Sequence, residues 1–241
     1  MTEDQSVELQ LYRTAMLLRP VLDRIVFVGG VVRGLLVTDS AVEGPRVTDD
    51  VDTIIEISTL LQYQAFESEL RSLGFKNDMR DDAPVCRYVH DTLTLDVMLT
   101  EPTLGFSNRW YPHAHRTATN HQISVAGMEP LTIRVISAAS FIATKLVSYL
   151  DRGKGDRYHR DLEDIIVLVD GRPSLFGELE MELTELRRYV AEEITGLLAD
   201  DLEQYVPGHL PGDPGNQARV PIVMTRLRRI GTLQGSRTDL T

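Results

Sequence analysis

The chain has 241 residues, of which 42% are hydrophobic and 25% charged. This length and composition predict one folded domain, or such a domain with a small helical appendage, and exclude a disordered protein. No run of about 18 apolar residues occurs and the first ten residues carry acids without an apolar segment, which excludes a membrane span and a secretory signal, so we expect a cytoplasmic protein. The net charge of -11 argues against non-specific wrapping of nucleic acid but leaves room for a local basic groove.

The first half of the chain is expected to alternate helices and strands. An amphipathic pattern over residues 6–19 predicts a helix that ends near Pro20, and the apolar run at 25–28 predicts a buried strand. Gly29 and Gly30 then predict a tight turn that opens a helix. The remaining expected elements are a helix over residues 31–37, a strand at 51–57, a helix over 60–73 and strands at 85–89 and 93–99.

The second half is expected to be helical. Helices are predicted over residues 135–150, 161–169 and 178–204, the last by apolar residues at three- and four-residue spacing opposite an acidic face. Proline and glycine predict a loop at 207–214, followed by an apolar segment at 220–230. We therefore predict an α+β fold, with a mixed β-sheet core flanked by helices over residues 1–130 and a helical C-terminal region over 131–241.

The strongest chemical signal is a pair of aspartates at the entrance to an expected strand. Side chains two residues apart on a strand point to the same face, so Asp50 and Asp52 are expected to project together. Two adjacent carboxylates repel each other unless a cation neutralises them, and Mg²⁺ with its oxygen ligands suits such a pair. A helix cap or a solvated turn is the alternative interpretation of an isolated Asp-x-Asp.

Two further features place this pair in a catalytic context. Asp96 lies between Leu95 and Val97 on an expected central strand, where an unpaired carboxylate is costly and a third metal ligand would explain it. The backbone of the Gly29-Gly30 turn can approach a phosphate closely because no Cβ stands in the way. Three carboxylates together with such a turn are typical of active sites for metal-assisted phosphoryl or nucleotidyl transfer.

The order of these motifs resembles a known family. The chain carries Val28-Gly29-Gly30, Arg46-x-Thr48-x-Asp50-Val51-Asp52, Asp96, a helical Lys145 and Arg160-Asp161-x-x-Asp164. This pattern resembles the nucleotidyltransferase fold shared with DNA polymerase beta, and most closely the AbiEii and MenT type toxin nucleotidyltransferases. The resemblance covers about residues 25–169, and the chain departs from it in the sequence Ser137-Ala-Ala-Ser before the lysine and in a longer loop before Arg46.

The resemblance implies a metal-dependent enzyme that transfers a nucleoside monophosphate from a nucleoside triphosphate such as ATP and releases pyrophosphate. It implies that Asp50, Asp52 and Asp96 bind Mg²⁺ or Mn²⁺ and act in catalysis with Lys145 and Asp161. The residues it implies for nucleotide binding are Gly29, Gly30, Arg33, Arg46, Thr48 and Lys145. The implied acceptor is a tRNA 3′ end or a protein hydroxyl, and the implied role is that of a toxin or phage-defence protein with a possible cognate antitoxin.

Several alternatives stay open on the sequence alone. The acceptor can be a small molecule, as in the aminoglycoside-modifying relatives of the fold, or the chain can be a non-catalytic module that binds a nucleotide or a partner. Asp161 can pair with Lys145 or cap its own helix. Zinc is an alternative for His113, His115 and His121, although their stretch, 109–121, predicts a mobile loop at the rim of an acceptor site. Cys86, as a single cysteine, excludes an internal disulfide and is interpreted as a small buried side chain rather than a nucleophile.

Overall fold

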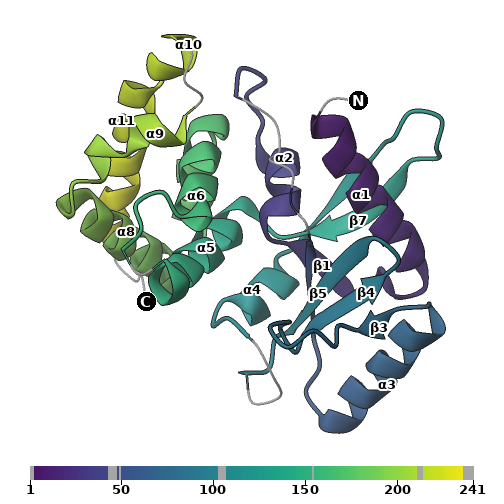
Figure 1. Cartoon of the computed structure of the whole chain (residues 1–241). Coiled ribbons are helices and arrows are strands. Elements are labelled where there is room, and N and C mark those ends of the chain that lie inside the picture. Colours follow the sequence, from purple (N-terminus) through teal and green to yellow (C-terminus); the bar gives the residue numbers. More distant parts are fainter. Residues whose placement is uncertain are drawn as a thin grey trace. The chain divides into compact units, whose positions relative to one another are not determined.

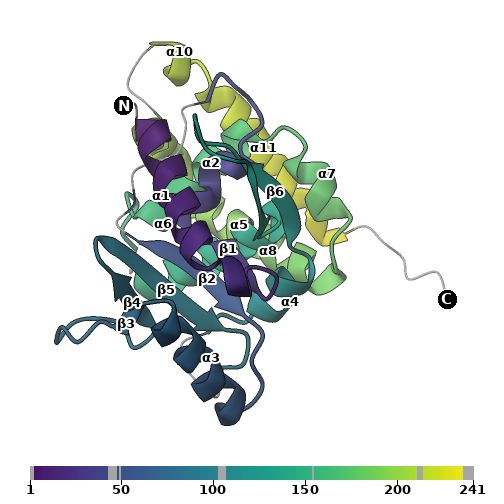
Figure 2. The same ribbon diagram turned by 90° about the vertical axis from the view of Figure 1, so that its right-hand side faces the viewer.

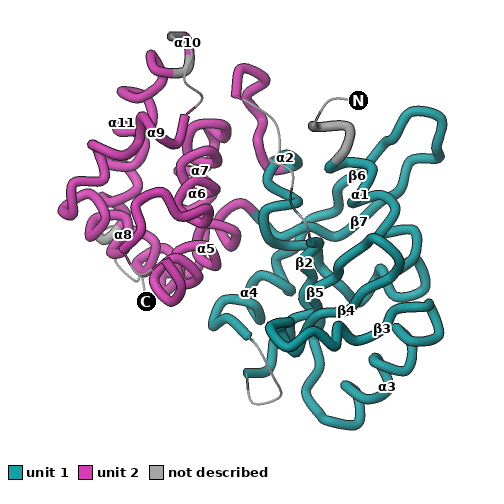
Figure 3. The backbone as a smooth tube through the Cα atoms, viewed as in Figure 1, with its two compact units in different colours: residues 1–35, 44–137 teal, residues 36–43, 138–241 magenta. Residues whose placement is uncertain are grey.

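A computed structural model describes residues 3–42, 48, 50–102, 107–153, 155–210 and 214–235. The chain divides into two compact units, one of residues 1–35 and 44–137 and the other of residues 36–43 and 138–241 (Figure 3). In the described part of the chain, no helix combines the length and the apolar character needed to cross a membrane.

The first unit is built on a seven-stranded mixed sheet. Its strands run in the order β3-β4-β5-β2-β1-β7-β6. Figure 1 labels β3, β4, β5, β1 and β7. The strands are β1 (Ile25–Val28), β2 (Val51–Ile55), β3 (Lys76–Asn77), β4 (Arg87–His90), β5 (Leu93–Leu99), β6 (Thr119–Ile123) and β7 (Leu131–Val135). β2 pairs with β5 in parallel and β1 with β7 in parallel, whereas the other neighbours are antiparallel. This confirms the predicted α+β class with a mixed sheet.

Helices precede or connect the strands of this sheet. They are α1 (Glu3–Leu17), α2 (Arg33–Leu36), which follows a 3₁₀ turn at Gly30–Val32, α3 (Leu60–Ser72) and α4 (Tyr111–Arg116). α1 packs against β7 and β5, and α3 lies beside β4, where the Tyr88 hydroxyl donates to Glu67 at 3.1 Å (Figure 2). Every residue of β1 is buried, as expected for the continuous apolar run of a strand covered on both faces.

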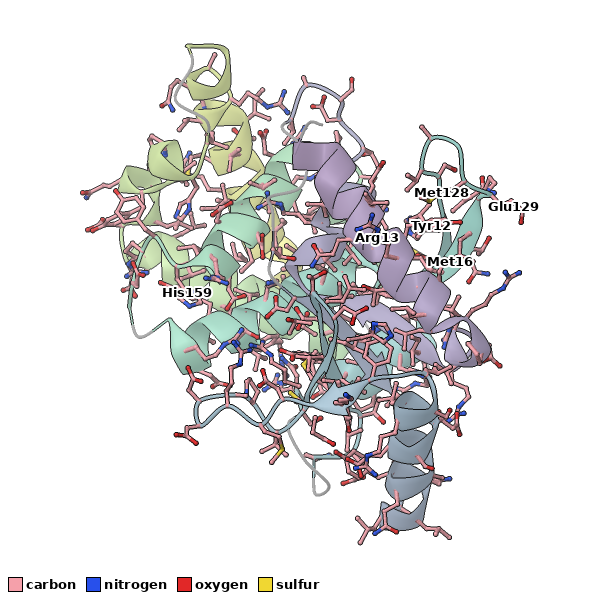
Figure 4. All side chains as sticks on the ribbon, turned by 45° about the vertical axis from the view of Figure 1, so that its right-hand side comes forward. Tyr12, Arg13, Met16, Met128, Glu129 and His159 are labelled. Atoms are coloured by element: carbon pink, nitrogen blue, oxygen red, sulfur yellow. The ribbon has the colours of Figure 1, made fainter. Side chains whose placement is uncertain are left out.

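A pocket of about 510 Å³ opens between α1 and two hairpin turns of this unit. Tyr12 and Met16 of α1 and Met128 of the β6–β7 hairpin line it, and the Tyr12 hydroxyl donates to the Glu129 carbonyl at 3.0 Å (Figure 4). None of the expected site residues lines this pocket.

The second unit is helical. Its longer helices are α5 (Ala138–Arg152), α6 (Arg160–Gly171), α7 (Leu175–Glu180), α8 (Thr184–Ala199) and α11 (Val220–Gly231), with short α9 (Val206–His209) and α10 (Pro214–Gln217) and 3₁₀ turns at Leu202–Gln204 and Thr232–Gly235. α5 packs on α6 and α8, and α11 packs on α8 and α6. The helical C-terminal region expected from the sequence is therefore present.

The segment 36–42 belongs to this helical unit although it precedes most of the sheet in sequence. The backbone N–H groups of Thr38 and Asp39 donate to the Gly171 carbonyl at 2.8 and 2.9 Å. Arg172 donates to the Leu36 carbonyl at 2.6 Å, and Arg219 bridges Asp39 and Asp170.

Four expectations about the elements were wrong. The single helix expected at 178–204 is divided, because α7 ends at Glu180, α8 begins at Thr184 and Arg187 donates to the Glu180 carbonyl at 3.2 Å. The stretch expected as a loop at 109–121 contains α4 and the start of β6. Val135, expected to begin a helix, ends β7, and this strand extends the sheet beyond residue 130. The loop expected at 207–214 begins inside α9, and its residues 211–213 lie outside the described part.

Candidate active site

Polar residues form a row across the centre of the sheet. In the parallel pair β2–β5, Asp52 lies opposite Asp96, and in the antiparallel pair β4–β5, Arg87 lies opposite the same Asp96. Neighbouring strands in a sheet lie about 4.8 Å apart, so side chains in register on one face are neighbours. The strand pairing therefore places two of the three expected metal ligands next to each other.

Gly29 allows Asp52 to occupy its place beside β1. Its φ is +71° and ψ is -169°, a combination that residues with a side chain essentially avoid. A Cβ at this position would stand 1.9 Å from Asp52 Oδ2, well inside van der Waals contact. The glycine turn thus gives the Asp52 carboxylate room against the backbone.

Arg87 joins the other two aspartates. Its Nε and Nη2 donate to the two oxygens of Asp96, each at 2.7 Å, and the same Nη2 donates to Asp50 Oδ2 at 2.8 Å. These charge-assisted hydrogen bonds raise the pKa of the Arg87 guanidinium further above its usual range, chiefly through Asp96. Asp50, Asp52 and Asp96 therefore gather around Gly29 and Arg87 at one place on the sheet.

Sequence reasoning missed Arg87, although a signal for it existed. Asp91 and Thr92 form a two-residue turn, and Asp91 adopts a φ of +50°. This turn pairs His90 with Leu93, and counting outward along both strands places Arg87 opposite Asp96. The turn alone would have fixed the register that brings the arginine to the carboxylates.

The donor set suits a hard divalent cation by its chemistry. All three expected ligands are carboxylates, which Mg²⁺ prefers, and Asp52 lies against a backbone cradle that any Cβ would fill. As they stand, no three His, Cys, Asp or Glu side chains among the described residues are arranged to surround an ion. Instead, the guanidinium of Arg87 lies between Asp50 and Asp96.

The other residues expected to bind the nucleotide lie in different surroundings. Thr48 donates from its hydroxyl to the Asp50 carbonyl at 2.8 Å, which supports the backbone just before β2. Gly30 begins the 3₁₀ turn after Gly29, and Arg33 is buried at the start of α2. Arg46 lies outside the described residues.

The helical unit contains a separate buried charge cluster. Lys145 of α5 contacts Asp161 at 2.9 Å and Asp164 at 2.7 Å, both on α6, and the two aspartates are 1% exposed. Burial alone would lower the pKa of the Lys145 ammonium, but the two carboxylates outweigh burial and raise it. Burial likewise opposes the ionised form of Asp161, yet Lys145 keeps the pKa of that carboxyl below its usual value.

This cluster decides between two interpretations of Asp161. The N-cap of α6 is His159, whose Nδ1 accepts from the Asp161 backbone N–H at 3.2 Å, so Asp161 is not the cap. Its carboxylate pairs with Lys145 and also accepts from Arg152 at 3.1 Å. Figure 4 shows His159 on this unit.

The structure also bears on the interpretations of the three histidines and of Cys86. His113 and His115 lie on α4 and His121 on β6, and they form no metal-binding group within the described part of the chain. Burial and the nearby Asp96 raise the pKa of the Cys86 thiol to about 11. A thiol with such a pKa is not ionised at neutral pH, which argues against a nucleophile, although Cys86 is half-buried rather than buried as expected.

Comparison with known proteins defines the fold. No protein-family model and no curated protein matches the chain. Among solved structures, it is similar to an antigenic nucleotidyltransferase-like protein from Paracoccidioides brasiliensis, with a TM-score of 0.51 and 18% identity over 83% of this chain and 91% of that chain. The chain therefore has a nucleotidyltransferase-like fold. At this identity the likeness shows the fold alone, and the resemblance to the AbiEii and MenT type stays a prediction.

Proposed function

We propose that the chain is a metal-dependent nucleotidyltransferase, which transfers a nucleoside monophosphate from a nucleoside triphosphate to an acceptor hydroxyl. The main support is the in-register pair Asp52 and Asp96 on neighbouring strands, beside a glycine that has no room for a side chain. A fold that serves only as a scaffold has no need to collect three carboxylates at one place, since their mutual repulsion is unfavourable.

In this proposal Asp50, Asp52 and Asp96 hold Mg²⁺ or Mn²⁺. When bound, the ion supplies positive charge to the reacting phosphate and to the departing pyrophosphate. Asp96 accepts the proton of the acceptor hydroxyl while the oxygen of that hydroxyl forms a bond to the α-phosphorus. The bond from the α-phosphorus to the bridging oxygen breaks, and pyrophosphate leaves with the electron pair.

The nucleotide phosphates are assigned to the turn after β1. Because Gly29 and Gly30 lack a Cβ, their backbone N–H groups can approach phosphate oxygens closely. Arg33, Arg46 and Thr48 are proposed as further nucleotide contacts on the basis of the motif.

Lys145 and Asp161 are proposed as the residues of the helical unit that turnover requires. A Lys145→Arg variant keeps the charge but replaces a point ammonium by a planar fork, so it should retain part of the rate that Lys145→Ala loses. Rates are measured per folded molecule, because the ion pairs of Lys145 are buried. Full activity in folded Lys145→Ala would remove Lys145 from the proposal.

The acceptor is proposed to be a tRNA 3′ end or a protein hydroxyl, with a toxin role that a cognate antitoxin restrains. The support for this part is the resemblance of the motifs. A tRNA end is recognised as a single strand through a small local surface, so the net charge of -11 does not oppose it.

One labelling experiment tests the reaction class. The full chain is incubated with Mg²⁺ and each nucleoside triphosphate, labelled at either the α- or the γ-phosphate, together with total RNA and cell lysate. We expect α-label, and no γ-label, on an acceptor whose class shows whether it is RNA, protein or a small molecule. Asp52→Asn should abolish transfer, whereas Asp91→Asn, at an 89% exposed side chain, should not. Transfer of γ-label, or no transfer from any nucleotide, would contradict the proposal.

A further inference from the structure

Arg87 occupies the position that a shared metal ion would need. Its Nη2 lies 2.7 Å from Asp96 Oδ2 and 2.8 Å from Asp50 Oδ2. A divalent cation ligated by these same two oxygens would stand about 2.0–2.6 Å from each of them. The nitrogen and the ion therefore cannot both lie between the two carboxylates.

We propose that Arg87 is the resident counter-cation of Asp50 and Asp96, and that it gives up these contacts when a divalent cation binds. This inference rests on the proposed function, because it assumes that the carboxylates are metal ligands. It adds that metal binding is an exchange of cations, in which the site loses a guanidinium as it gains the ion.

The position of Arg87 suits such an exchange. It lies on β4, whose outer neighbour in the sheet is the two-residue strand β3, and its side chain is 20% exposed. The guanidinium stands at the end of three methylene groups, so it can leave the carboxylates by rotation of its side chain while the β4–β5 pairing stays intact. Its charge also balances part of the repulsion among the aspartates while the ion is absent.

Metal affinity is the first test. The dissociation constant for Mn²⁺ is measured in the full chain by titration with electron paramagnetic resonance of free Mn²⁺, without substrate. Arg87→Gln removes the competing cation, and hydrogen bonds to charged groups predict that it binds Mn²⁺ roughly ten- to hundredfold more tightly than the unmodified chain. Arg80→Gln is the matched control, because Arg80 is 66% exposed on the same hairpin and pairs with Asp78. Its affinity should change by less than about twofold.

A second measurement separates displacement from simple repulsion. The arginine Nε–H signal of Arg87 is identified in a ¹H–¹⁵N spectrum by its loss in Arg87→Lys. In the metal-free chain this proton is expected to be protected by the 2.7 Å hydrogen bond to Asp96 Oδ1. Addition of Mg²⁺ should shift the signal and speed its exchange with water. This readout is made on the unmodified chain, with Arg87→Lys used only to assign the signal, so it does not depend on the folding of Arg87→Gln.

The outcomes distinguish the inference from the function beneath it. Tighter binding in Arg87→Gln together with a metal-induced change of the Arg87 signal supports the exchange. Equal affinities, or an Nε–H signal that Mg²⁺ leaves unchanged while Mn²⁺ binds normally, would overturn the exchange and leave the proposed metal site standing. Binding of Mn²⁺ by neither chain would overturn the metal site and the exchange together.

Discussion

At the scale of single residues, Gly29 has the closest neighbour to its Cβ position among the glycines whose surroundings are described. The backbone conformation excludes a side chain, and the Asp52 carboxylate fills the space where one would point. Gly29 is therefore required for two reasons. Its backbone has a positive φ, and a Cβ atom at this position would collide with Asp52.

A Gly29→Ala variant should lose stability and, to a much greater extent, activity. A residue with a side chain in this backbone conformation costs about 1–3 kcal/mol, and the new methyl group must push Asp52 away. A displacement of about 1 Å at a catalytic group can reduce the rate roughly a hundredfold. Gly127→Ala is the control, because Gly127 also has a positive φ of +80° but nothing within 4 Å of its Cβ position. Similar rates for the two variants would argue against a catalytic Asp52.

Lys145 offers a second residue-scale prediction, on stability. Lys145→Met should lower the free energy of unfolding by roughly 3–5 kcal/mol, because it leaves two buried carboxylates without their ammonium. Arg152→Met removes another cation from the same Asp161, but Arg152 is 60% exposed, so the loss should stay below about 1 kcal/mol. Urea unfolding at neutral pH measures both, and equal losses would contradict the importance of burial.

At the scale of elements, α3 has the most explicit start signal. Thr59 accepts from the Gln62 backbone N–H at 3.2 Å, and Gln62 Oε1 accepts from the Thr59 backbone N–H at 3.1 Å, which together form a capping box. Thr59→Ala should cost about 0.5–2 kcal/mol of stability. Ser58→Ala keeps the backbone bond of residue 58 to Gln62 and should cost less. Thermal unfolding of the two variants gives the comparison, and equal shifts would contradict the cap.

Elements whose patterns are local could be predicted from the sequence. The strand at 25–28 is apolar throughout and has the predicted bounds, and the strand at 93–99 agrees as well. The break between α7 and α8 could not be predicted, because apolar spacing continues across it while Leu183 is 55% exposed. Across the break, the Arg187 side chain donates a hydrogen bond to the Glu180 carbonyl. The spacing of apolar residues gives no information about such a contact.

The residues of the candidate site also differ in how far they could be predicted from the sequence. The identities of Asp50, Asp52 and Asp96 carry chemistry in the sequence itself, and their proximity follows from the pairing of β2 with β5. The role of Arg87 depends on the register between β4 and β5, which a two-residue turn at Asp91 and Thr92 sets but which the strand bounds expected at 85–89 did not give. In the helical unit, His159 rather than Asp161 caps α6, and the Asp161 carboxylate instead forms an ion pair with Lys145.

At the scale of the whole molecule, the net charge of -11 should make stability depend on salt. Raising NaCl from about 0.01 M to 0.15 M shortens the Debye length from about 30 Å to about 8 Å and screens the self-repulsion. At pH 8 the midpoint of thermal unfolding should therefore rise by roughly 2–4 °C. At pH 5.0, close to the pI, the same salt step should have little effect. A midpoint that falls with salt at pH 8 would show that surface ion pairs outweigh the repulsion.

The path of the chain between its two units has a consequence for how such a protein can change in evolution. The chain passes from one unit to the other three times, because residues 36–43 belong with the helices while residues 44–137 return to the sheet. A single recombination break after residue 137 would transfer α5 to α11 to a new gene but leave Thr38, Asp39 and their contacts to Gly171 and Arg219 behind. A shuffled descendant would therefore have to acquire both pieces of the helical unit at once.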